Sequence, residues 1–215
     1  MERELRNELV QYGCKMLDAG LITGTWGNLS ARSRAVMVIT PSGIGYSSLQ
    51  TDDIPVVDIE SGALLLQGKG SPSSELALHQ AIYQARPDIK AIIHTHSVYA
   101  TACAVSRMAI LPIVEDLAAL TGGTVEVADY APAGSEQLAK NAVIALGKNN
   151  AVLLANHGAV GCGTNLHEAM IACQLIEKTA KIFINAHSLP GEIKCIPSAD
   201  VERLHDFYVS KYRQR

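Results

Sequence analysis

The chain of 215 residues is 48% hydrophobic and 18% charged, and it carries a formal net charge of -3. This balance is typical of a globular protein and excludes an intrinsically disordered chain. A slightly acidic chain offers no basic surface to nucleic acid, and no apolar run approaches the ~20 residues that span a bilayer. We therefore expect one domain over residues 1–215, with neither nucleic acid nor a membrane as a partner.

The N-terminus and the cysteines bear on the cellular compartment. The first residues are charged rather than apolar, which predicts that no signal peptide is present. The 5 cysteines form no C-x-x-C pair, a pattern that favours free thiols in a reducing compartment. The expected location is cytoplasmic.

The spacing of apolar residues and turn formers divides the chain into alternating helices and strands. In the first half we expect a helix at 1–19, a glycine-rich loop at 24–30, strands at 36–40, 54–59 and 63–66, a helix capped by Ser73 or Ser74 and ending at Ala85, a strand at 90–95 and a helix at 97–105. In the second half we expect strands at 110–114 and 124–127, a helix at 135–146, strands at 151–155 and 159–161, and helices at 165–186 and 199–212.

This order of elements predicts an α/β protein in which helices cover both faces of a mixed sheet. Several of the expected strands are joined by short, hairpin-like connections. Because such connections join antiparallel neighbours, we expect antiparallel pairs rather than a purely parallel, doubly wound sheet.

Two histidines stand at alternate positions of a predicted strand, in the sequence His94-Thr95-His96. Residues i and i+2 of a strand project from the same face, so the two imidazoles can converge on one metal ion. The alternative is a pair of buried histidines that make structural hydrogen bonds. His157, beside Gly158 at the end of another apolar strand, is a third candidate ligand.

Three histidine ligands leave one coordination position open, which is typical of catalytic zinc sites, although manganese, iron or cobalt fits the same ligands. The other histidines lie in predicted helices or at their ends, and we interpret them as surface or structural residues. They are His79, His167, His187 and His205.

The run Ser73-Ser74-Glu75 stands at the predicted start of a helix. Hydroxyls and unpaired N–H groups at such a position bind anions, and a carboxylate next to a metal can act as a general base. The alternative is a capping segment whose glutamate is favoured by the helix dipole. Two loops, 24–28 and 40–43, offer further N–H groups to a phosphate, and Trp26 is either a packing anchor or a wall of the site.

Five short motifs follow one another along the chain. They are Gly24-Thr25-x-Gly27-Asn28-x-Ser30, Thr40-Pro41-Ser42-Gly43, Pro72-Ser73-Ser74-Glu75, His94-Thr95-His96 and Asn156-His157-Gly158. Their order and spacing resemble the class II aldolase/adducin family over nearly the whole chain, with the greatest similarity to its L-fuculose-1-phosphate aldolases. The resemblance implies a single-domain α/β/α sandwich with a central, largely antiparallel mixed sheet, and a homotetramer with active sites at subunit interfaces.

The resemblance also assigns roles to individual residues. His94, His96 and His157 would hold Zn²⁺, and Glu75 would be the acid/base residue that can also approach the metal at rest. The implied reaction is the reversible cleavage of a phosphorylated sugar, a ketose 1-phosphate, to dihydroxyacetone phosphate and an aldehyde, with zinc as Lewis acid. The residues implied to hold the substrate phosphate are Asn28, Ser42, Gly43, Ser73 and Ser74.

One position departs from the pattern of the family. The fuculose enzymes have a tyrosine, donated across the subunit interface, where this chain has Asp116. Asp116 could replace that tyrosine in protonating the leaving aldehyde oxygen, or it could form a solvated acidic pair with Glu115. Tyr208 and Tyr212 are candidates for a C-terminal tyrosine that contributes to the site of a neighbouring subunit.

Other members of the family share the zinc site and are alternatives to an aldolase. They include L-ribulose-5-phosphate 4-epimerases, dehydratases of methylthioribulose phosphate and decarboxylases of oxo-tetronate phosphates. Epimerases typically have aspartate where this chain has Glu75, which favours an aldolase, and a 5-deoxyribulose-1-phosphate aldolase is a close variant. The non-enzymatic alternative is an adducin-like assembly module, which the intact histidines and Glu75 disfavour.

Overall fold

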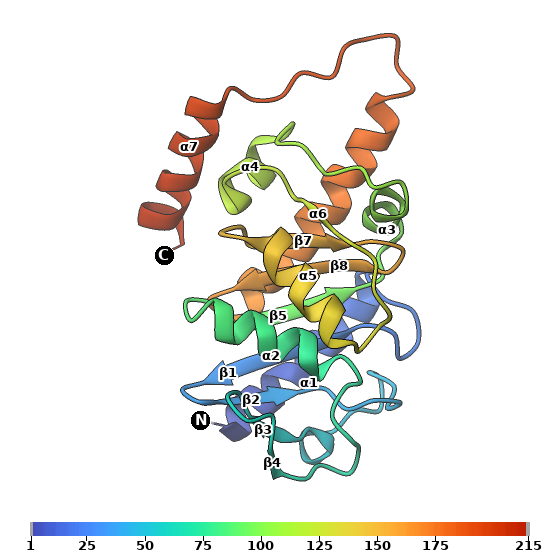
Figure 1. Cartoon of the computed structure of the whole chain (residues 1–215), viewed down its shortest axis with the longest axis vertical. Coiled ribbons are helices and arrows are strands. Elements are labelled where there is room, and N and C mark those ends of the chain that lie inside the picture. The colour runs from blue at the N-terminus through green and yellow to red at the C-terminus, as the bar shows by residue number, and fades with distance from the viewer. Residues whose placement is uncertain (1, 214–215) are drawn as a thin grey trace.

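The computed structural model describes residues 2–213. Within this range eight strands form one sheet in the order β4-β3-β2-β1-β5-β8-β7-β6, with helices on both faces (Figure 1). The strands are β1 (Asn28–Ser33), β2 (Val36–Ile39), β3 (Val56–Asp58), β4 (Leu64–Leu66), β5 (Ala91–Thr95), β6 (Val127–Ala128), β7 (Ala151–Leu154) and β8 (Gly158–Gly163). The helices are α1 (Glu2–Asp18), α2 (Leu76–Ala85), α3 (Val98–Val105), α4 (Glu115–Thr121), α5 (Glu136–Leu146), α6 (Leu166–Ala186) and α7 (Ser198–Phe207), with a 3₁₀ turn η1 (Thr51–Asp53) and a π-helical turn η2 (Tyr208–Tyr212).

Antiparallel pairing dominates the sheet. Among the described strands, β6 and β7 run parallel and the other neighbouring pairs run antiparallel. The prediction of an α/β/α sandwich with a mixed, largely antiparallel sheet is therefore confirmed. Strands β5 and β8 lie side by side in the middle of the sheet, where we expect the histidines.

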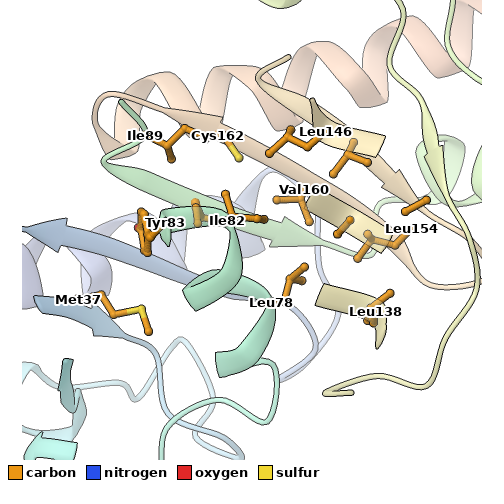
Figure 2. Packing of buried hydrophobic residues seen from close by; sticks show 14 of the residues in the cluster. Met37, Leu78, Ile82, Tyr83, Ile89, Leu138, Leu146, Leu154, Val160 and Cys162 are labelled. Carbon is orange, nitrogen blue, oxygen red and sulfur yellow. The ribbon is translucent and has the colours of Figure 1, made fainter. Parts of the chain in front are cut away.

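Helices α2 and α5 cover one face of the sheet and enclose the apolar cluster drawn in Figure 2. Ile82 of α2 and Leu138 of α5 pack there against Met37, Ile92 and Val160 of the strands. Burying one such side chain contributes roughly 1.5–3 kcal/mol to folding. This packing fixes α2 on the sheet, and with it the residues at the start of the helix.

Helices α1, α3 and α6 cover the opposite face. Strand β5 separates the two sides, because Ile92 belongs to the cluster under α2 whereas Ala91 and Ile93 belong to the cluster under α1 and α6. The period of two along a strand then directs His94 to the α2 side. Within residues 2–213, no helix combines the length and the apolar character that crossing a membrane requires.

Two elements were not expected from the sequence. Strand β1 begins within the predicted glycine-rich loop and extends beyond it, and its sequence Asn-Leu-Ser-Ala-Arg-Ser is poor in β-formers. It is a strand because it pairs with β2 on one side and β5 on the other. Helix α4 begins without a side-chain cap and is held by packing on α6 and α7.

Other expected boundaries also shift. The strands expected at 110–114 and 124–127 reduce to one bridge between Ile110 and Val125 and to the short β6. The N-cap of α2 is Glu75 rather than Ser73 or Ser74, which is a correction. The last helix ends at Phe207 and continues as η2, and α7 packs beside α4 at one end of the molecule (Figure 1).

Candidate active site

Strands from the centre of the sheet bring four side chains to one place. His94 is the next-to-last residue of β5, and His96 follows the end of that strand. His157 lies in the turn between β7 and β8, and Glu75 immediately precedes α2. Asn28, the first residue of β1, pairs directly with His94 across the sheet.

The ligand-type atoms of Glu75, His94, His96 and His157 all lie within 4.8 Å of one another. His94 Nε2 is 2.9 Å from His96 Nε2 and 3.1 Å from Glu75 Oε2. His157 Nε2 is 3.4 Å from Glu75 Oε1. Such separations suit ligands of one tetrahedral zinc ion, whose bonds to nitrogen and oxygen are about 2.0–2.2 Å long.

The hydrogen bonds of His94 support a cation at this cluster. Its Nδ1 is 3.0 Å from the carbonyl oxygen of Ala159, which can only accept, so Nδ1 carries the proton of the neutral ring. Its Nε2 therefore directs a lone pair at the carboxylate of Glu75. Glu75 Oε1 is buried and has no hydrogen-bond partner among the described residues. These converging acceptors fit a divalent cation such as Zn²⁺.

The electrostatics of the cluster favour the metal-binding forms of its side chains at neutral pH. Burial, and next the neighbouring His94, lower the pKa of both His96 and His157 to about 4. Burial alone would raise the pKa of Glu75, but its interactions with His94 and His157 and the hydrogen bond from Asn28 bring this pKa below its usual range. Two neutral rings and an ionised carboxylate are the forms that bind metals.

The turn that carries His157 is tightly packed against β5. A Cβ at Gly158 would lie 2.1 Å from the carbonyl oxygen of Thr95, so only glycine fits there. Asn156 has a left-handed φ of 56°, and its Oδ1 accepts a 2.5 Å hydrogen bond from Arg107. These contacts fix the position of His157 relative to β5.

A cavity of about 210 Å³ adjoins the cluster on the side of the serine motifs. Its two loops are tied together, because Ser42 Oγ accepts a 3.0 Å hydrogen bond from the N–H of Ser74. Among the described residues that line it, none is lysine or arginine. The cavity brings together Glu75, His96, His157 and the residues expected to hold a phosphate, Asn28, Ser42, Gly43, Ser73 and Ser74.

Asn28 and His79 connect Glu75 to the buried face of α2. Asn28 Nδ2 donates a 2.8 Å hydrogen bond to Glu75 Oε2, and its Oδ1 is 2.5 Å from His79 Nε2. One amide hydrogen of Asn28 remains for a substrate. His79 is completely buried, and burial lowers its pKa to about 3. Its spacing of four residues from Glu75 on one helix face is the signal that sequence reasoning missed.

Trp26 is a wall of the site rather than a packing anchor. Its side chain is 67% exposed, and its ring centroid lies 6.0 Å from that of His96. Together with Thr23 and Asn156 it lines a second hollow beside His96 and His157. The cluster is thus flanked by a serine-lined cavity and by a hollow with an aromatic wall.

Asp116 and Tyr212 do not join this cluster within one chain. Both line an apolar hollow of about 720 Å³ between α4, α6 and α7, and neither lines the cavity at the histidines. Asp116 forms an ion pair with Lys178. The ring of Tyr212 stacks on that of Tyr208, whose hydroxyl donates a 3.0 Å hydrogen bond to Glu168.

The α/β/α fold with a cluster of histidine and glutamate at the centre of its sheet is typical of a metal-dependent enzyme, and the cluster is able to bind a metal ion. Residues 7–184 match the family described as Class II Aldolase and Adducin N-terminal domain, and the chain belongs to this family. Its relatives include class II aldolases, which are lyases, and the protein is an enzyme of that class.

Three comparisons cover nearly the whole chain. It is 38% identical to the 5-deoxy-D-ribulose 1-phosphate aldolase of Bacillus thuringiensis serovar kurstaki, over 93% of this chain and 92% of the relative. It is 33% identical to the L-fuculose phosphate aldolase of Escherichia coli K12, over 94% of this chain and 93% of the relative. A solved L-fuculose 1-phosphate aldolase superposes with a TM-score of 0.91 at 38% identity, covering 96% of each chain.

Proposed function

We propose that the protein cleaves a ketose 1-phosphate that ends in a methyl group, such as L-fuculose 1-phosphate or 5-deoxy-D-ribulose 1-phosphate, to dihydroxyacetone phosphate and an aldehyde. The observation that carries this proposal is the placement of Glu75 between three histidines and a serine-lined cavity. Both named substrates are those of relatives at 33–38% identity, and both give the same phosphorylated product. The apolar face of Trp26 suits their terminal methyl groups.

In this mechanism His94, His96 and His157 would hold Zn²⁺, and the bound ion would supply Lewis acidity at the substrate carbonyl. The bond between C3 and C4 breaks, the hydroxyl on C4 loses its proton as the aldehyde forms, and C3 gains a proton. Glu75 moves the proton at C3, because its Oε1 is buried beside the histidines and has no hydrogen-bond partner among the described residues. Asn28 holds the other carboxylate oxygen of Glu75 in place.

The phosphate of the substrate lies in the serine-lined cavity, held by Ser42, Gly43, Ser73 and Ser74 and by the remaining amide hydrogen of Asn28. A Ser74→Ala variant is expected to raise KM about 10-fold or more with a smaller change in kcat, because a hydrogen bond to a charged group contributes roughly 1.5–3 kcal/mol. Steady-state kinetics measure this effect, with Ser188→Ala at the exposed end of α6 as control. A KM that stays unchanged in both Ser74→Ala and Ser42→Ala would place the phosphate elsewhere.

The protein acts as a homotetramer in which Asp116 and Tyr212 serve the metal site of a neighbouring chain. Support comes from the hollow that both residues line, whose apolar rim leaves Phe207 58% and Tyr212 65% exposed. Such a surface is typical of a contact between copies. In that position the carboxylate of Asp116 would take up the proton that the C4 hydroxyl loses as the aldehyde forms, and it would return this proton in the condensation direction.

Co-expression of two inactive variants, His94→Ala and Asp116→Ala, is expected to restore activity. If each site uses two chains, about a quarter of the sites in mixed tetramers combine two intact contributions. Activity of the copurified mixture, with light scattering for the mass, measures this. A mixture as inactive as its components, or a monomer with full activity, would contradict shared sites.

The proposed reaction is tested by supplying metal-analysed protein with L-fuculose 1-phosphate, 5-deoxy-D-ribulose 1-phosphate and L-ribulose 5-phosphate. We expect dihydroxyacetone phosphate from one or both of the first two, detected by its enzymatic reduction with NADH. Epimerisation of L-ribulose 5-phosphate without cleavage of the others, followed by NMR, would identify an epimerase instead. Inertness towards all three, together with no bound metal, would favour an assembly module.

A further inference from the structure

We propose that His79, as the neutral tautomer protonated at Nε2, is a positioning residue that orients Glu75 through Asn28. The inference rests on the proposed role of Glu75 as the residue that moves a proton. It concerns a buried hydrogen-bonded chain that leads from the interior of the sheet to the site.

The chain consists of five side chains in series. Tyr83 Oη is 2.9 Å from Ser30 Oγ, and Ser30 Oγ is 2.6 Å from His79 Nδ1. His79 Nε2 is 2.5 Å from Asn28 Oδ1, and Asn28 Nδ2 is 2.8 Å from Glu75 Oε2. All five residues are buried, and the side chains of Ser30 and His79 are fully so.

The ionised carboxylate of Glu75 sets the direction of every bond in this chain. A carboxylate only accepts, so the NH₂ group of Asn28 must face Glu75 and its carbonyl oxygen must face His79. His79 Nε2 must then donate, which leaves Nδ1 as an acceptor for the hydroxyl of Ser30. The oxygen of Ser30 in turn accepts from the hydroxyl of Tyr83.

This arrangement distinguishes the two oxygens of Glu75. Oε2 is engaged by Asn28, whereas Oε1 is buried without a hydrogen-bond partner among the described residues. Oε1 is therefore the oxygen that takes up and releases the proton. If His79 were protonated at Nδ1 instead, the lone pair of its Nε2 would face the lone pair of Asn28 Oδ1. The amide of Asn28 would then turn over and direct its oxygen at the carboxylate of Glu75.

Apolar packing alone does not account for His79. Its neighbours in the surrounding cluster, such as Leu78 and Ile82 of the same helix, fill the core with aliphatic side chains. A polar ring at the same depth is stable only with both nitrogens hydrogen-bonded. One of these two bonds leads to Asn28, whose other end holds Glu75.

The first test reads the tautomer directly. ¹⁵N NMR of the metal-free protein, with His79→Gln to assign the signals, is expected to show Nε2 protonated and Nδ1 unprotonated at pH 7. Protonation at Nδ1 instead would overturn the proposal. This measurement depends on neither metal nor substrate.

The second test separates positioning from packing. His79→Leu is expected to lower kcat about 10–100-fold, as for other partners that orient a metal-site ligand, with little change in KM. His79→Gln keeps a donor near Asn28 and should recover most of kcat. Ile82→Val, on the same buried face of α2, is the control that lowers the thermal midpoint without lowering kcat.

Ser30→Ala covers the case in which His79→Leu does not fold. Without the hydroxyl that donates to Nδ1, we expect a mixture of His79 tautomers and a fall in kcat at unchanged KM. Unchanged kcat in Ser30→Ala and in a folded His79→Leu would overturn the positioning role. If the unchanged protein released no dihydroxyacetone phosphate, the proposed function itself would fail while the tautomer of His79 could still be read by NMR, so the two failures are distinguishable.

Discussion

A His94→Ala variant is expected to lose bound zinc and to cleave its substrate at least about 10³-fold more slowly than the unchanged protein. His94 is fully buried at the centre of the cluster, and its Nε2 is close to both His96 and Glu75. Among the described histidines, only His96 and His157 join it in the cluster. Loss of a Lewis acid removes several kcal/mol of transition-state stabilisation, and about 4 kcal/mol of this energy corresponds to about 10³-fold in rate.

Thermal unfolding gives a readout of this variant that is independent of activity. A ligand at about 100 times its Kd stabilises the folded state by roughly 2.7 kcal/mol, so added Zn²⁺ should raise the Tm of the unchanged protein. The Tm of His94→Ala should not respond. His187→Ala is the matched control, because His187 is exposed at the end of α6 and contacts no residue of the cluster. Stoichiometric zinc in purified His94→Ala would refute the assignment of this ligand.

Replacement of Glu75 by glutamine is expected to lower kcat about 10²–10⁴-fold, the usual contribution of a positioned acid or base. Asn28 donates to Oε2, so the new side chain must place its carbonyl oxygen there and its NH₂ group at the position of Oε1. A donor would then stand where the proton acceptor is needed. Zinc should remain bound, because the three histidines are unchanged.

Proton exchange on dihydroxyacetone phosphate isolates this step from cleavage. In deuterated buffer the unchanged protein should exchange one hydrogen of the product, as followed by ¹H NMR, whereas Glu75→Gln should not. Glu136→Gln, on the exposed face of α5, controls for the loss of one carboxylate. A Glu75→Gln variant that binds zinc and exchanges at the normal rate would remove Glu75 from the proton-transfer role.

The local part of the site could be predicted from the sequence. The convergence of His94 and His96 follows from the period of two in a strand that is apolar up to its end, and the structure brings the rings within a centroid separation of 4.8 Å. His157 and Glu75 could be joined to them because their motifs occur in a known order. Helix boundaries such as the Ser135 cap of α5 follow from local chemistry, since Ser135 Oγ accepts from the N–H of Leu138.

Features that depend on distant contacts could not be predicted. Strand β1 forms only because two neighbours supply its hydrogen bonds, and no pattern within Asn28–Ser33 indicates them. His79 looked like an ordinary helical histidine, because its burial is decided by strands on which α2 packs. Within one chain Asp116 and Tyr212 line a hollow away from the histidines, and this placement is decided by the packing of α4, α6 and α7 rather than by a local sequence pattern.

The tight fit at Gly158 and the open setting of Trp26 have a consequence for altering substrate range by directed evolution. Gly158 admits no side chain against the carbonyl of Thr95, so randomising the turn around it would yield mostly inactive proteins. Trp26 is largely exposed and lines the hollow next to the histidines. A small library at Trp26 and Thr23 should therefore change which aldehydes are accepted while the buried half of the site keeps its chemistry.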